Sequence, residues 1–379
     1  MTKNKMVVVG MSGGVDSSVA AYLLKQQGYN VVGLFMKNWE ETNERGCCGA
    51  EADFADVKRV CEAIDIPYYS INFSQEYMDK VFAHFLDGLK RGITPNPDIL
   101  CNREIKFGPF LDFADKIGAD FIATGHYARS VATKHMAEPS QGVATCHTHE
   151  LQRAIDDTKD QSYFLCALSQ KQLSRVMFPL GDMVKSDVRK VAKKLGLVTH
   201  DKKDSTGICF IGERNFRNFL ETYLGKEPGD IKTLDGNIVG KHGGLMYYTI
   251  GQRKGLGVGG QRDAGPTQLE TSRWFVVKKD LDTNTLYVSN GDCPELYSRC
   301  LVASNFNWIT QPEKFPFTCT AKTRYRQPDQ ECVVENEAGG FSVRVKFNKP
   351  QRAVTPGQWV VLYDGDVCLG GGEIAEVQS

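Results

Sequence analysis

The sequence predicts an α/β protein in which an N-terminal doubly wound parallel sheet is followed by a small central domain and a C-terminal β-barrel. Strand and helix signals alternate through the N-terminal half, as in a parallel sheet covered by helices. The first strands are nearly continuous apolar runs, which is typical of strands buried on both faces. From about residue 230 the chain changes to short runs rich in Gly, Thr, Val and aromatic residues, which favour all-β structure. We therefore expect domains at 1–213, 214–273 and 274–379.

The N-terminal half begins with a buried strand at 5–10, because Lys5-Met-Val-Val-Val-Gly10 is a short, uninterrupted apolar run. A Gly-Ser-rich turn and a helix follow, and Gly28 stands where a C-cap glycine belongs. Ligands of such folds bind at the carboxyl ends of the strands. Further strands are predicted at 31–35, 67–71 and 121–124, and further helices at 52–64, 76–89, 105–117 (interrupted at 108–109), 161–173 and 186–195.

The second half contains one long irregular segment and then many short strands. Residues 134–150 have no hydrophobic period and are predicted to form a loop. The short strands are separated by turn residues and indicate a small barrel or sandwich. They are predicted at 274–278, 285–289, 317–323, 331–335, 341–347 and 358–363.

Composition limits the function classes. Among 379 residues, 46 Lys and Arg balance 46 Asp and Glu, so contact with nucleic acid must come from local patches. No apolar run approaches the about 18 residues that span a bilayer, and the first strand begins too early for a targeting peptide. We therefore expect a soluble, cytoplasmic protein without membrane contact. The 12 cysteines include no C-x-x-C pair, so their spacing supports no metal or iron–sulfur cluster, and most should be reduced thiols.

The most specific motif is the phosphate loop, Gly10-Met-Ser-Gly-Gly-Val-Asp-Ser-Ser18, between the first strand and the first helix. Its glycines let backbone N–H groups approach an anion, its serines add hydroxyl donors, and the helix N-terminus favours negative charge. It lacks the Gly-Lys-Ser/Thr of a Walker A loop and the spacing of a dinucleotide fingerprint. A plain glycine-rich turn is the alternative interpretation.

Two cysteines have contexts that distinguish them from the other ten. Cys101 follows the Asn96-Pro-Asp98 turn at a predicted helix start, near Arg103 and Lys106, an environment that favours thiolate. Cys209 follows a Ser-Thr-Gly turn at the edge of an apolar stretch. The adjacent Cys47 and Cys48 have two interpretations, loop packing or an accessory redox or metal contact.

Several motifs together resemble a known family. The phosphate loop resembles the PP-loop of N-type ATP pyrophosphatases, which fits an adenine nucleotide alpha-hydrolase-like fold for the first domain. In chain order it precedes Asn96-Pro-Asp98 with Cys101, Thr124-Gly-His-Tyr-Ala128, Asp157-Thr-Lys-Asp-Gln-Ser-Tyr163, Ser205-Thr-Gly-Ile-Cys-Phe210 and Lys322-Thr-Arg-Tyr-Arg326. The set closely resembles the tRNA-specific 2-thiouridylase family across all three expected domains. The segment at 134–150 looks longer than is usual in that family.

The resemblance implies roles for individual residues. Asp98 would be a general acid or base, Cys209 would carry sulfur as a persulfide, and Cys101 would form a disulfide with Cys209 to complete the transfer. Asp16 would help to position magnesium or pyrophosphate. Implied ATP contacts are Gly10, Met11, Ser12, Gly13, Gly14, Val15, Asp16, Ser17, Met36 and Gly125, and implied tRNA contacts are Asn96, Pro97, Asp98, Lys159, Asp160, Gln161, Arg324 and Tyr325.

The implied reaction is ATP-dependent replacement of O2 of the wobble uridine, position 34 of tRNA, by sulfur. ATP and Mg²⁺ are the expected cofactors. The expected partners are the anticodon arm of tRNA, with Arg324 on phosphate and Tyr325 stacking, and a cysteine desulfurase or sulfur-relay protein. Attack by the persulfide and attack by released hydrosulfide both remain open, and we expect a monomer.

Other interpretations remain at the level of sequence. Another PP-loop enzyme, such as an amide ligase, would share the ATP chemistry without needing both cysteines, and a non-catalytic RNA-binding protein would not need an intact phosphate loop. Residues 185–203 carry seven Lys or Arg and two Asp, and the helix pattern places the cations outward. That surface would be either a tRNA phosphate track or an ordinary solvated face.

Overall fold

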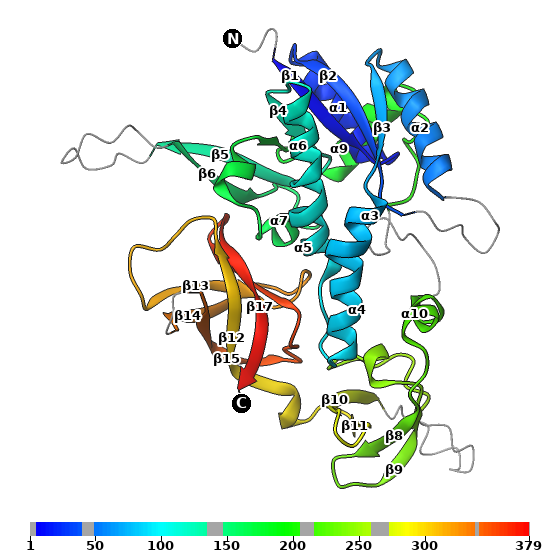
Figure 1. Ribbon diagram of the computed structural model, residues 1–379. Coiled ribbons are helices and arrows are strands. Elements are labelled where there is room, and N and C mark those ends of the chain that lie inside the picture. Colours follow the sequence, from blue (N-terminus) through cyan, green and yellow to red (C-terminus); the bar gives the residue numbers. More distant parts are fainter. Residues whose placement is uncertain are drawn as a thin grey trace.

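The computed structural model describes residues 5–39, 49–134, 147–204, 216–258, 273–337 and 341–378 (Figure 1). Its N-terminal domain is built on five parallel strands in the order β3-β2-β1-β4-β7. The order reverses between β1 and β4, so the crevice at their carboxyl ends is the expected ligand site of this fold. The strands are β1 (Met6–Met11), β2 (Asn30–Lys37), β3 (Tyr68–Asn72), β4 (Phe121–Ala123) and β7 (Val176–Met177).

Helices cover both faces of this sheet, which confirms the doubly wound prediction. On one face, apolar residues of α1, α2 and α9 pack in a single buried cluster. On the other face, α4, α5 and α6 share a second cluster with residues of the barrel. The bounds are α1 (Val15–Gln26), α2 (Gly49–Ala63), α3 (Ser74–Tyr77), the π-helical turn η1 (Met78–Phe82), α4 (Ala83–Lys90), α5 (Pro97–Cys101), the π-helical turn η2 (Asn102–Lys106), α6 (Pro109–Lys116) and α9 (Lys185–Lys194).

Two expectations for the following segment differ from the structure. At the ends of the expected loop at 134–150, β5 (Ala128–Lys134) pairs with β6 (His147–Arg153), so residues 134 and 147–150 are strand, while residues 135–146 lie outside the described residues. The expected helix at 161–173 is two short helices, α7 (Ser162–Leu165) and α8 (Gln170–Leu173). Ser169 makes a capping box with Gln172, which begins a new helix within the predicted one.

The middle domain is a four-stranded sheet in the order β10-β11-β8-β9, preceded by α10 (Phe216–Leu224). Its strands are β8 (Gly229–Thr233), β9 (Ile238–His242), β10 (Trp274–Asp280) and β11 (Thr285–Asn290), and a short turn of 3-10 helix, η4 (Leu245–Tyr247), follows β9. The expected domain boundary at 274 therefore differs from the strand pairing, which keeps β10 and β11 with β8 and β9. Strand signals alone carry no information on which distant strand is the partner.

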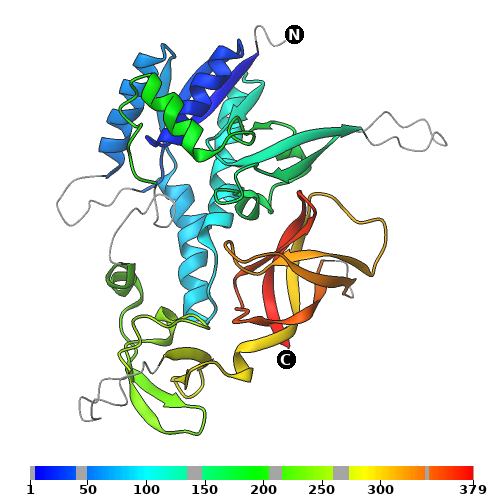
Figure 2. The same cartoon turned by 180° about the vertical axis from the view of Figure 1, so that it is seen from behind.

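The C-terminal domain is a closed antiparallel barrel of six strands, in the order β12-β15-β14-β13-β16-β17, with β12 pairing β17 to close it. The strands are β12 (Tyr297–Trp308), β13 (Phe317–Lys322), β14 (Gln330–Asn336), β15 (Val343–Arg352), β16 (Trp359–Asp364) and β17 (Val367–Gln378). The β5–β6 hairpin of the first domain attaches to β17, and Figure 2 shows it beside the orange and red barrel strands.

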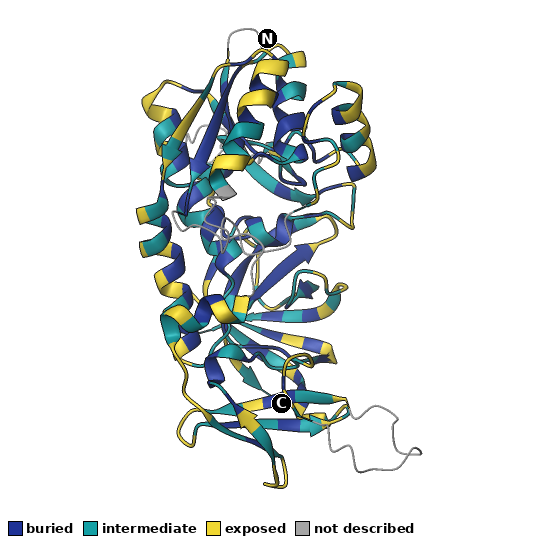
Figure 3. Ribbon diagram, turned by 90° about the vertical axis from the view of Figure 1, so that its right-hand side faces the viewer, coloured by how far each residue is buried: buried dark blue, intermediate teal, exposed yellow. Residues whose placement is uncertain are grey.

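Buried apolar residues form separate clusters on the two faces of the parallel sheet, inside the barrel and in the middle sheet (Figure 3). One of them crosses a domain boundary, because Trp359, Val361 and Tyr363 of β16 pack with α4–α6 and α7. The barrel is therefore fixed against the first domain. Among the described residues, no helix is long and apolar enough to cross a membrane.

Candidate active site

The phosphate loop lies where the sequence places it, between β1 and α1. Gly13 has φ +74°, and a Cβ there would lie 2.6 Å from the carbonyl oxygen of Asp53, so this position requires glycine. The hydroxyls of Ser12 and Ser17 lie 3.2 Å apart across the loop. Within the described ranges, no side chain caps the first turn of α1, whose N-cap is Gly14. The N–H groups of this turn can therefore bind an anion, which is the requirement for a nucleotide phosphate.

Gly125 and Met36 lie against the same loop from β4 and β2, the strands on either side of β1. A Cβ on Gly125, just after β4, would lie 2.6 Å from the backbone nitrogen of Ser17. Met36, near the end of β2, is 7% exposed, and its Cε would lie 3.3 Å from a Cβ built on Gly10. The structure thus brings the predicted ATP-contacting residues together at the point where the strand order reverses.

Asp16 is held by two side chains, Lys185 and Tyr127, for which the sequence predicted no role at this loop. Lys185 Nζ lies 2.7 Å from each carboxylate oxygen, and the Tyr127 hydroxyl donates to Oδ1 at 2.8 Å. The side chain of Lys185 is only 11% exposed. Burial, and next the charge of Asp16, raise the pKa of Tyr127, which therefore remains a neutral donor. The arrangement places a buried cation directly beside the phosphate loop.

Asp204 lies on the other side of this cation. Its carboxylate oxygens lie 2.9 Å from Lys185 Nζ, 3.0 Å from Arg189 Nη2 and 2.7 Å from Lys159 Nζ. Burial alone would raise the pKa of Asp204, but hydrogen bonds from Lys159 and Lys185 outweigh it and lower the pKa to about 2. Asp204 is therefore ionised throughout the neutral range. Lys159, predicted to contact tRNA, lies in this network.

The expected outward placement of the cations at 185–203 is wrong for three of the seven. Lys185 and Arg189 face Asp204, as described above, and Lys202 Nζ contacts Asp53 at 2.8 Å, Asp56 at 2.7 Å and the carbonyl of Gly13 at 2.9 Å. The reason is tertiary: α9 packs against α1, so its first residue meets the phosphate loop. Helical periodicity shows which side of a helix is apolar but cannot show that a buried lysine has carboxylate partners.

Asp98 and Cys101 share the short helix α5. Asn96 is its N-cap, since Oδ1 accepts from the N–H groups of Asp98 at 3.2 Å and Ile99 at 3.4 Å. Cys101 is fully buried at the end of α5, beyond the first turn, so the expectation that it sits at a helix start is wrong. Cys209, Cys47 and Cys48 lie outside the described residues.

Three predicted substrate-contacting stretches converge beside α5. Asn102, next to Cys101, donates through Nδ2 to the carbonyl of Phe164 at 2.9 Å, and the ring of Phe164 lies 4.4 Å from that of Tyr325. Phe164 follows the predicted 159–161 segment. In that segment Gln161 accepts from the N–H of Tyr127 at 3.0 Å, which links it to the phosphate loop. The structure therefore connects the thiol helix, the 159–161 segment and Tyr325.

Asp160 and Arg324 are engaged within the protein. Asp160 is 6% exposed and accepts from the Ser162 hydroxyl at 2.8 Å. Burial raises the pKa of Asp160, and its hydrogen bonds only partly oppose this. Arg324 Nη2 donates to the carbonyl of Ile250 at 2.9 Å, to that of Ala353 at 3.0 Å and to the hydroxyl of Thr355 at 3.1 Å. Asp160 therefore orders the turn that precedes α7, and Arg324, next to Tyr325, connects the barrel with the middle domain.

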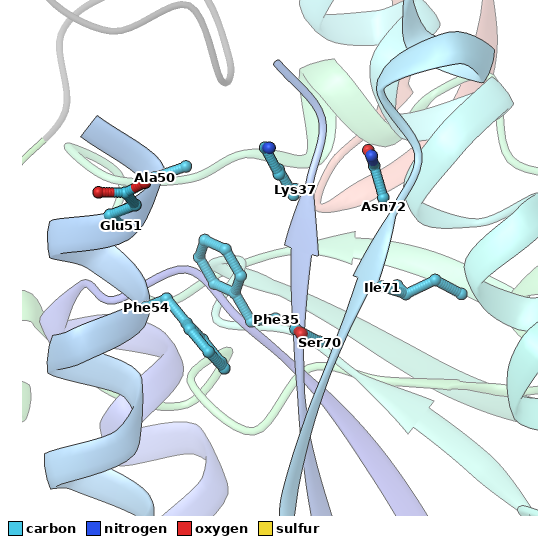
Figure 4. A pocket seen from close by; sticks show the side chains of 8 residues that line it. All are labelled: Phe35, Lys37, Ala50, Glu51, Phe54, Ser70, Ile71 and Asn72. Atoms are coloured by element: carbon cyan, nitrogen blue, oxygen red, sulfur yellow. The ribbon is translucent and has the colours of Figure 1, made fainter. Parts of the chain in front are cut away.

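Two cavities lie near these residues. The first, of about 270 Å³, lies between α2 and the carboxyl ends of β2 and β3. Figure 4 shows the rings of Phe35 and Phe54 between α2 and β2, with Lys37 further along β2. The second, of about 240 Å³, lies where the loop before α5 meets α10 and the middle domain, and Pro97 lines it. The residues lining the second cavity are Phe85, Leu89, Thr94, Pro95, Pro97, Phe216, Arg217, Leu220, Met246, Tyr247 and Thr249.

In the part of the chain that the structure describes, no three His, Cys, Asp or Glu side chains are grouped so as to hold a metal ion. A nucleotide-associated cation that also binds phosphate oxygens needs fewer protein ligands. Asp16, at the loop, is the described carboxylate placed for such an ion.

Three family models match consecutive parts of the chain. Residues 5–213 match the model described as tRNA methyl transferase HUP domain, 217–290 the tRNA methyl transferase PRC-barrel domain, and 298–374 the Aminomethyltransferase beta-barrel domain. The first of these models covers more than half of the chain.

Curated relatives match over nearly the whole chain. The tRNA-specific 2-thiouridylase MnmA of Alkaliphilus oremlandii is 55% identical over 377 residues, covering 99% of this chain and 98% of the relative. The enzyme of the same name from Oceanobacillus iheyensis is 57% identical over 379 residues, covering 98% and 95%. A solved structure, the U34-tRNA thiolase NcsA from Methanococcus maripaludis, aligns at 19% identity and TM-score 0.34 over 59% of this chain and 68% of that one. On the sequence matches, this chain belongs to the tRNA-specific 2-thiouridylase family.

Proposed function

We propose that this protein is a tRNA-uridine 2-sulfurtransferase that uses ATP to convert the wobble uridine of tRNA to 2-thiouridine. The observation that supports the proposal is the connection described above, in which hydrogen bonds of Asn102, Gln161 and Tyr127 link the thiol-bearing helix to the phosphate loop in a chain of this family. The phosphate loop suits cleavage of ATP, and the helix that carries Cys101 suits sulfur chemistry. A simple ATP-dependent ligase needs only the first.

In the first step, O2 of the uridine attacks the α-phosphorus of ATP, and pyrophosphate leaves. The N–H groups of the phosphate loop and the first turn of α1 would hold the phosphates, and Gly125 and Met36 would lie along the adenosine. The product carries AMP on O2, which turns a poor leaving group into a good one. The loop has no Walker lysine, but two lysines lie beside it: Lys185 contacts Asp16 and Lys202 contacts the carbonyl of Gly13, so both would offset this charge.

Magnesium fits this site through Asp16. Mg²⁺ prefers oxygen ligands and commonly combines one or two carboxylates with phosphate oxygens. Asp16 would hold the ion, which would supply positive charge to the leaving pyrophosphate. Lys185, whose Nζ lies 2.7 Å from both Asp16 oxygens, would add its own charge beside the phosphates.

In the second step, sulfur displaces AMP. A persulfide on Cys209, supplied by a cysteine desulfurase or sulfur-relay protein, would attack C2 through its terminal sulfur, and AMP would leave with the original oxygen. Cys101 would then attack the Cys209 sulfur, so that a Cys101–Cys209 disulfide forms and the transferred sulfur stays on C2. If Cys101 acts first, the same disulfide forms and hydrosulfide becomes the nucleophile. Asp98, in the first turn of α5, would act as the general base that accepts the proton of the attacking sulfur nucleophile.

The tRNA would be recognised beside α5. Reaction at O2 requires the uridine to leave the anticodon stack, and Asn96, Pro97 and Asp98 would line the site that receives it. The adjoining cavity of about 240 Å³ adds the aromatic side chains of Phe216 and Tyr247 and the cation of Arg217, a combination suited to an unstacked base of the anticodon arm.

The test is nucleoside mass spectrometry of unmodified tRNA incubated with the protein, ATP, Mg²⁺ and a persulfide donor. We expect 2-thiouridine at position 34 with the wild type and none with Cys101→Ala or Cys209→Ala, while both variants still bind ATP. Cys293→Ala, which changes a partly exposed thiol of the middle domain's edge, is the matched control and should retain activity. ATP cleavage without thiolated uridine, given a competent donor, would contradict the proposal.

A further inference from the structure

The barrel contains two thiols in contact, outside the proposed active site. Cys319 on β13 and Cys332 on β14 are directly opposite each other in an antiparallel pair, and their Sγ atoms lie 3.7 Å apart. Opposed residues of an antiparallel pair have Cα atoms about 4.5–5.5 Å apart, within the about 4.4–6.8 Å range of disulfides. A covalent bond between these sulfurs therefore requires side-chain rotation and no change of strand register.

The two thiols differ in accessibility. Cys332 is 2% exposed and belongs to the barrel core, while Cys319 is partly exposed. A small oxidant would therefore meet Cys319 first, and Cys332 would be the resolving thiol. The hydrogen bond with Cys332, then burial and the charge of Asp364 on β16, raise the pKa of Cys319. Little thiolate is present at neutral pH, so the pair should react slowly there and faster at alkaline pH.

We propose that Cys319 and Cys332 are a redox-active dithiol that closes to an intramolecular disulfide on reaction with a low-molecular-weight disulfide. The Cys319 thiolate attacks one sulfur of the oxidant, which forms a mixed disulfide and releases the first small thiol. The Cys332 thiolate then attacks the Cys319 sulfur and releases the second. In total, two protein thiols lose two electrons and two protons, and one small disulfide becomes two thiols.

The bond would fasten a segment with contacts to other parts of the molecule. The turn between β13 and β14 carries Arg324, bonded to the middle domain, and Asp329, whose Oδ1 lies 2.8 Å from Arg153 Nη2 of the first domain. A disulfide in the middle of this hairpin restricts the opening of both strands that lead to the turn. Closure would thus stabilise the turn without involving the catalytic thiols.

The experiment uses the full chain, reduced and then exchanged into excess oxidised glutathione at pH 8.5. After alkylation and proteolysis, peptide mass mapping should recover Cys319 and Cys332 in one disulfide-linked pair, about 2 Da lighter than the sum of the two thiol peptides. Peptide mapping separates this bond from any disulfide of Cys101 and Cys209. Amide hydrogen exchange of residues 323–329 should be slower in the oxidised than in the reduced protein.

Two variants make the result decisive. Cys319→Ser should leave Cys332 open to alkylation and remove the change in hydrogen exchange. Cys300→Ser should leave the Cys319–Cys332 bond intact, because Cys300 on β12 lies opposite Lys346 and Gln378 rather than another cysteine. In the wild type, Cys300 should form only a mixed disulfide and so reports that the oxidant reacted. The proposal is overturned if Cys300 is glutathionylated while Cys319 and Cys332 stay reduced and are recovered as alkylated thiols. It is also overturned if Cys319 is recovered as a mixed disulfide with glutathione and no bond to Cys332 forms.

Discussion

Lys185 and Asp16 show how single residues at the phosphate loop depend on distant parts of the chain. The lysine starts α9, yet its ammonium group contacts both oxygens of a carboxylate in the first turn of α1. A buried ion pair is costly to break, because removing one partner leaves the other charge buried and unpaired. Loss of Asp16 would leave the ammonium group of Lys185, whose side chain is 11% exposed, without one of its carboxylate partners. Asp204 reinforces the pair from the other side.

We predict that Lys185→Met lowers the rate of ATP-dependent thiolation by about 100-fold, in the range measured for loss of one preorganised electrostatic contact. The control is Lys190→Met on the same helix, where the side chain is 77% exposed and pairs only with Asp187 among the contacts described. Single-turnover release of pyrophosphate measures the first step directly. Equal rates for the two variants would exclude a role for Lys185 in ATP activation.

Gly125 illustrates a purely steric requirement. We expect Gly125→Ala to displace the turn at Ser17, since the added methyl group would lie 2.6 Å from its backbone nitrogen. ATP affinity should fall at least about 10-fold, or about 1.4 kcal/mol. Gly240→Ala, whose nearest neighbour would lie 3.5 Å away, should bind ATP normally. Equilibrium binding of ATP to both variants is the measurement, and an unchanged affinity for Gly125→Ala would contradict this account.

At the scale of elements, the sequence predicted those features that depend on local pattern. Strands β1 and β2, helix α9 and the phosphate loop were identified because apolar runs, helical spacing and turn glycines are local signals. Strands β12 and β17 were missed, although both are 12 residues long, because polar residues interrupt the apolar pattern of β12 and three consecutive glycines interrupt that of β17. The pairing of β10 and β11 with β8 and β9 depends on long-range contacts, which no local pattern contains.

The residues of the candidate site also fall into two groups, those that local sequence motifs or the family resemblance predict and those whose role depends on tertiary contacts. The loop residues were identified through their motif, Met36 and Gly125 through the family resemblance, and they meet in the structure. Lys185 was assigned to the solvent face, because a lysine at the first position of a helix gives no sign of burial. Arg324 was expected on phosphate, whereas the structure shows three intramolecular acceptors for it. The roles of Lys185 and Arg324 depend on side chains and carbonyls that are distant in the sequence, and no local pattern predicts these partners.

Strand β10 carries a partly buried lysine, Lys279, that makes the stability of the middle domain depend on pH. Burial lowers the pKa of Lys279 from 10.5 to about 8. Between these values the unfolded chain binds more protons than the folded one, so stability rises as pH increases from about 8 to about 10.5. The stabilisation is present above the unfolded pKa and is lost as pH falls through the folded pKa. Its upper limit is about 3 kcal/mol.

We predict that this rise is absent in Lys279→Met. Urea unfolding of the wild type and the variant at pH 7 to 10 gives the difference in free energy of unfolding at each pH. That difference should shift in favour of the wild type as pH increases. Lys278→Met changes the neighbouring side chain, which is 65% exposed, and should keep the wild-type slope. Parallel pH profiles for the wild type and Lys279→Met would show that Lys279 does not titrate in this range.

On the scale of the whole molecule, contacts around β16 and the β13–β14 turn connect all three domains. The Tyr163 hydroxyl of the first domain donates to the carbonyl of Trp359 in the barrel at 2.9 Å. The hydroxyls of Thr94 and Thr249 lie 3.3 Å apart between the first and middle domains. Arg324 connects the barrel with the middle domain. Because the proposed tRNA site is assembled from all three, its shape depends on these connections.

Arg324 allows a test between two ways of contributing to tRNA binding. Its charge could bind a phosphate directly, or its hydrogen bonds could hold Tyr325 and the middle domain in position. We predict that Arg324→Ala weakens tRNA binding about 10-fold and lowers the thermal midpoint, since two carbonyls and a hydroxyl lose their donor. The dependence of log affinity on log salt should keep its slope, because each lost phosphate contact would reduce the slope by about 0.7–0.9. Arg326→Ala, at an exposed neighbouring position, should leave the thermal midpoint unchanged. Titrations of labelled tRNA at several salt concentrations supply the slopes.

A smaller slope with an unchanged thermal midpoint for Arg324→Ala would mean that the guanidinium leaves its internal acceptors and binds phosphate. An unchanged slope with weaker binding would mean that Arg324 acts by holding Tyr325 and the middle domain in place.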